Sequence, residues 1–141
     1  MRKYAAWWAG QPYERKTLNK DVPFIRTERG EEVRSKSEMI IADLLYQLHI
    51  PYKYECPVRL QGLGVVHPDF TILNMRTRKE ILWEHCGRMD DPDYLYKAYE
   101  RQAAYTKNGY FQGKNIIYTF ETDKMPLNSR MVRSYIEEYF Q

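Results

Sequence analysis

The hydrophobic residues of this chain follow a helical spacing immediately after Ser35. Between residues 36 and 50 the apolar positions recur every three or four residues, which is typical of an amphipathic helix. Ser35 or Ser37 can cap the start of this helix with a side-chain oxygen. Pro51 stops the pattern because proline cannot continue a helix. The pattern therefore predicts a first helix that begins near residue 36.

Two later stretches show the same helical spacing. Residues 90–92, Asp-Asp-Pro, open the first of them, and proline is tolerated in the first turn of a helix. This helix is expected to end near Asn108-Gly109, because glycine commonly follows a helix C-terminus. A last amphipathic helix is predicted over residues 131–140, with Asn128 or Ser129 as its cap.

Between these helices lie four short stretches rich in β-branched and aromatic residues. They span residues 52–60, 65–73, 79–87 and 114–120, and each predicts a strand. Pro68 implies an edge position or a bulge in the second strand, because proline has no N–H for the ladder. The resulting order of helix, three strands, helix, strand and helix predicts an α/β fold. We expect a mixed four-stranded sheet flanked by helices on both faces.

The charge of the chain is distributed unevenly along its length. The 141 residues fit one domain, and the formal net charge is +3. Residues 1–36 hold nine Lys or Arg and five Asp or Glu, whereas the remainder is close to neutral. We therefore divide the chain into a basic leader over residues 1–34 and a folded domain over residues 35–141. A basic leader suits a polyanionic partner, although a solvated, flexible N-terminus explains the charge equally well.

The leader shows no clear periodicity, but Trp7 and Trp8 are expected to dock on the domain because exposed paired indoles would be sticky. No apolar signal segment and no stretch of transmembrane length is visible in the sequence. The two cysteines indicate neither a disulfide framework nor a zinc site and fit a reducing compartment. A cytoplasmic protein without membrane contact is the resulting expectation.

Three acidic residues stand on predicted apolar elements, where a carboxylate is costly unless it is paired or holds a cation. Glu38 lies in the first turn of the first helix, Asp69 on the second strand and Glu84 on the third. Carboxylates on neighbouring strands, with another on a flanking helix, form an oxygen cage suited to Mg²⁺. Taken one at a time, each carboxylate is better explained by solvation or a local ion pair, but the set of three favours a metal site.

These residues resemble the PD-(D/E)XK nuclease superfamily. Fourteen residues separate the Pro68-Asp69 pair from Glu84 on the next strand, and Glu38 resembles the additional acidic position of that superfamily. The predicted order of elements is similar to the restriction-endonuclease-like αβββαβ core, and the resemblance spans about residues 30–122. It implies metal binding by Asp69, Glu84, the backbone carbonyl of His85 and Glu38, with Mg²⁺ or Mn²⁺ as the cofactor.

The chain departs from the superfamily at Cys86, where a lysine that positions the attacking water is expected. Arg101 on the second helix, one turn before Tyr105, is our first choice for the replacement cation, and Lys36 is the second. A surface salt bridge for Arg101 and core packing for Tyr105 are the simpler explanations. The auxiliary candidates for the site are four residues: Glu55, His67, Cys86 itself and Tyr105. Edge protection would explain Glu55 equally well, and a structural hydrogen bond is the simpler explanation for His67.

The sequence thus predicts a divalent-metal-dependent nuclease, and the expected reaction is hydrolysis of DNA phosphodiester bonds. It does not separate DNA from RNA, nor single-stranded, double-stranded and branched substrates. A homodimer would supply the two sites needed to cut both strands of a duplex. The alternatives are a catalytically inactive nucleic-acid-binding or assembly module with the same fold, which the missing lysine favours, and a small interaction domain with incidental carboxylates.

Overall fold

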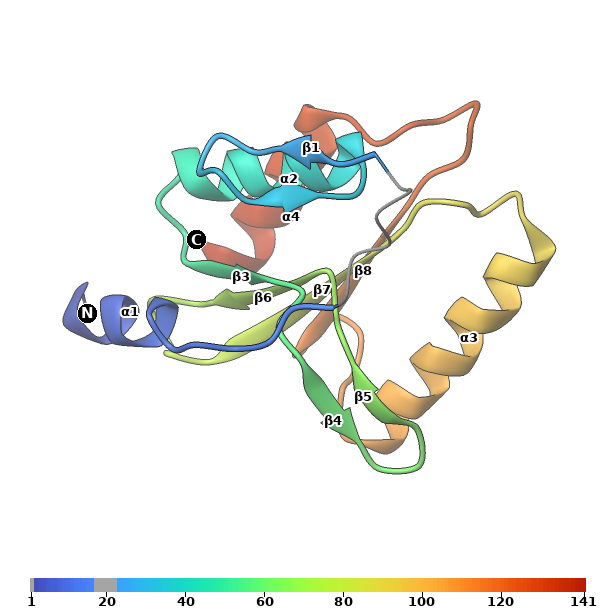
Figure 1. Cartoon of the computed structure of the whole chain (residues 1–141), viewed down its shortest axis with the longest axis horizontal. Helices are drawn as coiled ribbons and strands as arrows, with labels where there is room; N and C mark the ends of the chain where they lie inside the picture. Colours follow the sequence, from blue (N-terminus) through green and yellow to red (C-terminus); the bar gives the residue numbers. More distant parts are fainter. Residues whose placement is uncertain (1, 17–22) are drawn as a thin grey trace.

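The computed structural model describes residues 2–16 and 23–141, and it shows an α/β fold built on a mixed four-stranded sheet (Figure 1). Residues 1 and 17–22 of the predicted leader lie outside the described part. The helices are α1 (Arg2–Ala9), α2 (Lys36–Gln47), α3 (Pro92–Lys107) and α4 (Ser129–Phe140). The strands are β1 (Ile25–Arg26), β2 (Glu32–Val33), β3 (Tyr52–Tyr54), β4 (Val58–Leu60), β5 (Gly64–Val66), β6 (Phe70–Leu73), β7 (Glu80–Cys86) and β8 (Ile116–Phe120).

The main sheet has the order β3-β6-β7-β8. β3, β6 and β7 form an antiparallel meander, and β8 returns parallel to β7 after the crossover through α3. In the register Tyr54 pairs with Phe70, and Phe70 pairs with Trp83. The predicted meander, crossover helix and returning strand are therefore confirmed.

Helices cover both faces of the sheet, as the sequence predicts. Alternate residues of β7 point to opposite faces. Ile81 and Trp83 join the larger core under α2 and α4, whereas Leu82 and Cys86 join a smaller core beneath α3. Trp83 is fully buried and stacks on Phe140 of α4. This division matters for the site, because Glu84 lies between Trp83 and His85 and so faces α3.

Side-chain caps fix where the helices begin. Ser35 accepts a hydrogen bond from the backbone N–H of Glu38 at the start of α2, so Ser35 and not Ser37 is the cap. Asp91 caps α3 ahead of Pro92, and Asn128 caps α4. In the described residues, no helix combines the length and the apolarity needed to cross a bilayer.

The predicted strands 52–60 and 65–73 are wrong as continuous strands, because each is broken near its middle. The register on either side of the break is the same, since Tyr54 pairs with Phe70 and Val58 with Val66. Glu55 adopts a positive φ of 55°, which turns the chain out of the extended conformation. The far halves pair as β4 and β5 in a separate sheet, which projects from the main sheet as an arm (Figure 1).

Pro68 lies in this break and not within a strand. β6, which follows it, is an interior strand of the main sheet, so of the two alternatives expected for Pro68, an edge position or a bulge, the edge position is wrong. Pro57 occupies the opposing segment of the same break. Neither proline can donate a ladder hydrogen bond, which explains why pairing is interrupted where the two segments face each other.

The N-terminal residues hold more regular structure than their sequence suggests. α1 docks through Trp8, which is 3% exposed, donates to Glu80 at 2.8 Å and lies under the Lys53 ammonium. Trp7 is 60% exposed, so the expected docking of both indoles is wrong for this residue. The two residues point about 100° apart on the helix, and α1 turns Trp8 toward the domain and Trp7 toward solvent.

Candidate functional site

Three carboxylates lie on neighbouring chain segments where the main sheet meets the break. They belong to Glu55, Asp69 and Glu84, and we call them the acidic row. The register aligns Glu55 with Asp69, whose carbonyl accepts from the Glu55 N–H at 3.1 Å. It also aligns Asp69 with Glu84, and the Asp69 N–H donates to Glu84 Oε1 at 3.0 Å. Asp69 Oδ2 in turn accepts from the His85 N–H at 2.7 Å. Asp69 thus lies beside Glu84, as the sequence predicts.

Glu38 approaches this row from the first turn of α2. Its side chain is 7% exposed, and its Oε1 accepts from the Arg34 N–H at 2.9 Å and from Ser35 Oγ at 3.2 Å. Burial and the nearby charge of Asp69 raise the pKa of Glu38 from 4.5 to about 8, and the Glu55 charge adds to this. The predicted position of Glu38 over the strand ends agrees with this electrostatic contact.

Burial also raises the pKa of both central carboxyls. For Asp69 the charge of Glu84 is the next cause, while the N–H of His85 and the Arg101 guanidinium oppose the shift. For Glu84 the opposing influences are Arg101, the N–H of Asp69 and the hydroxyl of Tyr105. The group therefore holds protons more firmly than separate carboxylates would, and a cation placed among them would release those protons.

Arg101 is the cation that α3 brings to the row. Its Nε lies 2.8 Å from Glu84 Oε2, and the Tyr105 hydroxyl donates to the same oxygen at 3.4 Å. Glu84 is almost fully buried, whereas the Arg101 side chain is 40% exposed. Arg101 thus pairs with Glu84 and not with the surface carboxylates Glu100 or Glu137, and Tyr105 combines core packing with a contact to the site.

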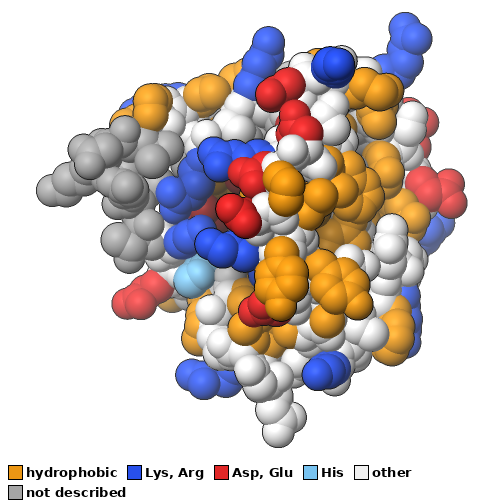
Figure 2. All heavy atoms as spheres, turned by 90° about the vertical axis from the view of Figure 1, so that its right-hand side faces the viewer, with side chains coloured by type: hydrophobic (Ala, Val, Ile, Leu, Met, Phe, Trp, Pro, Cys, Tyr) orange, Lys and Arg blue, Asp and Glu red, His pale blue; other side chains and the backbone are white. Residues whose placement is uncertain are grey.

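Two further arginines that sequence reasoning missed bind the other end of the row. Arg34 Nε lies 2.6 Å from Glu55 Oε2, and Arg15 Nη2 lies 3.2 Å from Glu55 Oε1. Glu55 is 3% exposed, so it is a buried partner of two guanidinium groups and not an edge charge. On the side that α3 presents, Figure 2 shows Lys and Arg side chains gathered around carboxylates. The only signal in the sequence was the excess of basic residues in the leader.

Tyr54 was also missed. Its hydroxyl is buried and has no hydrogen-bond partner among the described residues. Burial raises the pKa of this phenol, and the charges of Glu38, Glu55 and Asp69 raise it further. Tyr54 therefore carries a neutral hydroxyl next to the acidic row.

Of the remaining predicted residues, some lie close to the acidic row and others do not. Cys86 is buried beside Glu84, and burial followed by the Glu84 charge raises its pKa to about 11, so it stays a neutral thiol. The His85 ring points to the other face of the sheet, as expected, where Nδ1 contacts Thr119 and Nε2 contacts Glu121. The His85 carbonyl accepts a long hydrogen bond from the hydroxyl of Tyr94, at 3.5 Å.

Lys36 and His67 do not join the acidic row in the described contacts. Lys36 is exposed in the first turn of α2, and His67 is half-buried in the break before β6. Within residues 2–16 and 23–141, no group of three His, Cys, Asp or Glu side chains is gathered closely enough to hold one metal ion. Guanidinium groups stand against two of the carboxylates, Glu84 and Glu55.

The comparisons with known proteins add one relative. No family model matches the chain, and no solved structure matches it. An alignment over 95 positions, which covers 63% of this chain, is 37% identical to an uncharacterised protein of Methanocaldococcus jannaschii. The alignment covers 8% of the relative's length, so the chain corresponds to a small part of a much longer protein.

Proposed function

We propose that this protein is a metal-dependent nuclease with a restriction-endonuclease-like core that hydrolyses phosphodiester bonds in DNA. The observation that carries the proposal is the aligned row of Glu55, Asp69 and Glu84, with Glu38 facing it from α2. Four carboxyl groups meet three arginines there, and burial with mutual repulsion raises the pKa of Glu38, Asp69 and Glu84, so this buried arrangement is electrostatically costly. A stable fold has little reason to accept that cost unless the site binds a cation.

The order of the elements supports the same proposal. α2, β3, β6, β7, α3 and β8 follow one another as helix, three antiparallel strands, helix and parallel strand. Asp69 precedes the second strand of this series, and Glu84 lies on the third. These are the positions that the resemblance to PD-(D/E)XK nucleases assigns to the metal-binding carboxylates. The arm of β4 and β5 is an addition to that core.

The donor set fits a hard divalent cation, Mg²⁺ or Mn²⁺, because all its members are oxygen ligands. Asp69, Glu84 and the His85 carbonyl would hold it, and Glu38 would complete the shell or orient a water. When bound, the ion would polarise the phosphodiester and lower the pKa of a bound water. Arg101 would have to leave Glu84 Oε2, and its 40% exposed side chain has room to turn outward.

Arg101 takes the part of the cation that Cys86 cannot supply. A guanidinium stays protonated at neutral pH, so Arg101 cannot act as a general base. It can donate to a phosphate oxygen and stabilise the negative charge that develops during attack. Arg15 and Arg34 pair with Glu55, at the other end of the row from Glu84. There they can contact neighbouring phosphates of the same nucleic-acid strand.

The test is incubation of the purified protein with circular DNA, linear single- and double-stranded DNA and RNA, in Mg²⁺, Mn²⁺ or EDTA. We expect cleavage of DNA that EDTA abolishes, and loss of cleavage in Asp69→Asn and Glu84→Gln. Asp123→Asn, which neutralises an exposed carboxylate, is the matched control and should cut like the wild type. Circular dichroism of each variant verifies folding. Cleavage that persists in EDTA or in both site variants would refute the proposal.

A second candidate is a nucleic-acid-binding or assembly module that has the same fold without catalysis. The ion pair of Arg101 with Glu84 favours it, because the guanidinium already offsets the carboxylate charge without metal. The neutral thiol of Cys86 favours it as well, because it cannot take the part of the missing lysine. Retention of DNA in a filter-binding assay, with no cleavage in either metal, would support this module. The absence of both binding and cleavage would favour an interaction domain with incidental carboxylates.

A further inference from the structure

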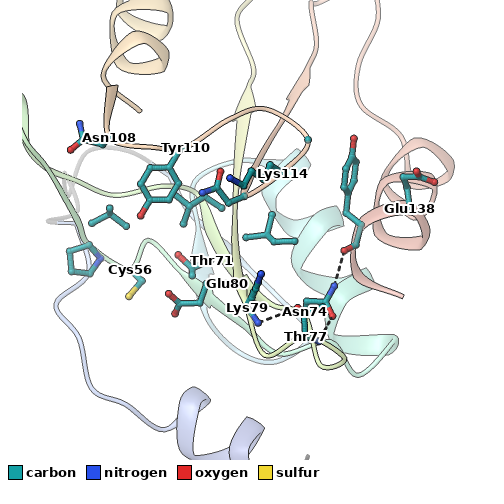
Figure 3. Close-up of a pocket in the computed structure, with 17 residues that line it drawn as sticks. Cys56, Thr71, Asn74, Thr77, Lys79, Glu80, Asn108, Tyr110, Lys114 and Glu138 are labelled. Atoms are coloured by element: carbon teal, nitrogen blue, oxygen red, sulfur yellow. Dashed lines mark hydrogen bonds between the residues drawn. The ribbon is translucent and has the colours of Figure 1, made fainter. Parts of the chain in front are cut away.

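The two ends of β7 are held differently. Near its start, Glu80 lines an open cleft of about 840 Å³ (Figure 3). Near its end, on the face opposite to Glu84, the ring of His85 is enclosed by other side chains. The His85 side chain is 4% exposed, and both of its ring nitrogens have hydrogen-bond partners. The end of β7 that reaches the acidic row is therefore the firmly held one.

A chain of hydrogen bonds runs through the His85 ring. The Trp83 indole N–H donates to Thr119 Oγ1 at 3.0 Å, and the same oxygen lies 2.7 Å from His85 Nδ1. Because an indole N–H can only donate, the Thr119 hydroxyl keeps its own hydrogen for Nδ1. Nδ1 then accepts, and Nε2 carries the hydrogen that it donates to Glu121 Oε1 at 2.5 Å. This assignment gives every hydrogen of the chain an acceptor.

Glu121 extends this chain to α2 and to the segment before α4. Its Oε1 also accepts from the Ser37 hydroxyl, and its Oε2 accepts from the Leu127 N–H at 3.1 Å. Burial opposes ionisation, but the hydrogen bonds from Ser37, His85 and Leu127 lower the pKa of Glu121, so it is a charged acceptor. The Glu121 N–H donates to the Cys86 carbonyl at 3.0 Å, which holds its backbone beside β7. We call the contacts of Glu121 with His85 and Ser37 the Glu121 bridge.

Both ends of the Glu121 bridge lie next to proposed cation ligands. At one end, the backbone N–H of His85 donates to Asp69 Oδ2 at 2.7 Å. At the other end, Ser37 immediately precedes Glu38 in the first turn of α2. The bridge therefore joins α2 to β7 beside the two carboxyl groups, those of Glu38 and Asp69, that must approach each other to share a cation.

We propose that Glu121 is a positioning residue for the cation site, which sets the approach of Glu38 to Asp69 by holding α2 against β7. The inference rests on the proposed function, because this approach matters only where the two carboxyl groups bind one ion. In the described hydrogen bonds Glu121 contacts neither of them, so it acts through Ser37 and His85. Removing a group that orients metal ligands from behind typically weakens metal binding roughly 10- to 100-fold.

Calorimetric titration of the purified protein with Mn²⁺ tests the proposal. Glu121→Gln keeps the size of the side chain but loses its charge, and Ser37→Ala removes the contact to α2. Each variant should bind Mn²⁺ about tenfold or more weakly than the wild type. Ser134→Ala, which removes a hydroxyl from an exposed position of α4, is the matched control and should bind like the wild type. Thermal unfolding in EDTA verifies that each variant is folded at the temperature of the titration.

A double-mutant cycle separates positioning from a general loss of stability. Because the Ser37 end of the bridge acts through Glu38, Ser37→Ala should weaken Mn²⁺ binding much less in the Glu38→Gln background, where that ligand charge is already gone. A bridge with a purely structural role would lower the unfolding temperature and leave the Mn²⁺ affinity of the folded protein unchanged. If Glu121→Gln does not fold, Ser37→Ala and its cycle decide between these roles.

The outcomes distinguish this inference from the proposed function. Folded Glu121→Gln and Ser37→Ala proteins that bind Mn²⁺ like the wild type would overturn the positioning role and leave the proposed function intact. An equal effect of Ser37→Ala in both backgrounds would also overturn it. A wild type that binds no Mn²⁺ would refute the proposed function, and the positioning role with it.

Discussion

Glu38→Gln is expected to make the protein more stable above neutral pH. The introduced glutamine can keep the acceptor oxygen that receives the Arg34 N–H and the Ser35 hydroxyl, so the substitution removes charge and little else. In the wild type the pKa of Glu38 rises from 4.5 to about 8 on folding. A carboxyl whose pKa is raised by folding binds its proton more firmly in the folded state, so its stability contribution is present below pH 4.5 and is lost as the pH rises to about 8.

The size of this loss follows from the same two values. At about 1.36 kcal/mol for each pH unit, the interval from 4.5 to about 8 corresponds to a loss of at most about 5 kcal/mol. Glu38→Gln should recover most of this lost stability at pH 8 and almost none at pH 4.5. For a domain of this size we expect a rise in Tm of roughly 10 °C at pH 8.

Urea unfolding at pH 4.5, 6.5 and 8, followed by the fluorescence of the buried Trp83, measures the difference. Mg²⁺ extends the test to the proposed cation: it should stabilise the wild type at pH 8 and stabilise Glu38→Gln less, because one ligand charge is gone. A wild type whose stability does not fall between pH 4.5 and 8, or a variant with the same pH profile as the wild type, would refute the reasoning about the acidic row.

Three further predictions concern the cations and α1. Arg101→Ala should slow DNA cleavage, measured by initial rates, while the affinity for Mn²⁺, measured by calorimetry, stays equal or rises. If Lys36→Ala is inactive and Arg101→Ala is not, Lys36 is the replacing cation. Cys86→Lys in the Arg101→Ala background should restore part of the rate, and no gain in a folded protein would argue against the superfamily geometry at this position. Trp8→Ala should destabilise the fold by about 3–5 kcal/mol in urea unfolding, because a buried indole and its hydrogen bond to Glu80 are lost, whereas exposed Trp7→Ala should change little.

Local patterns were enough to predict the elements that carry their own signal. α2, α3 and α4 have apolar faces at helical spacing and side-chain caps in the sequence, and β7 alternates between two cores. α1 and the β1–β2 pair lack such patterns because tertiary contacts hold them, as Trp8 does for α1. The two broken strands were misread because alternation continues in register through the break. Pro68 was read as a sign of an edge position or a bulge, and Pro57 was not considered.

The residues of the candidate site also divide into those that the sequence could reveal and those that it could not. Glu38, Asp69 and Glu84 could be found because carboxylates on apolar elements are conspicuous in a sequence. Arg15 and Arg34 could not, since their partner Glu55 is 40 and 21 residues away along the chain, and only the fold brings them together. The hydrogen bonds that orient Asp69 and Glu84 involve backbone N–H groups, which any residue could supply, so the sequence holds no trace of them.

The break in the long hairpin explains how the sheet can orient these carboxylates. In an unbroken ladder, backbone N–H groups at this level would pair with backbone carbonyls of the neighbouring strand. Here the N–H of Asp69 donates to Glu84 Oε1, and the N–H of His85 donates to Asp69 Oδ2. The two carboxylates therefore take the place of backbone carbonyl acceptors. Each accepts a hydrogen bond from a backbone N–H of the segment that carries the other. Because an N–H stabilises the charged form of a carboxyl, the break offsets part of the repulsion that burial and proximity create. Pro68, the residue before Asp69, thus stands where the ladder between β6 and β7 ends and side chains replace its acceptors.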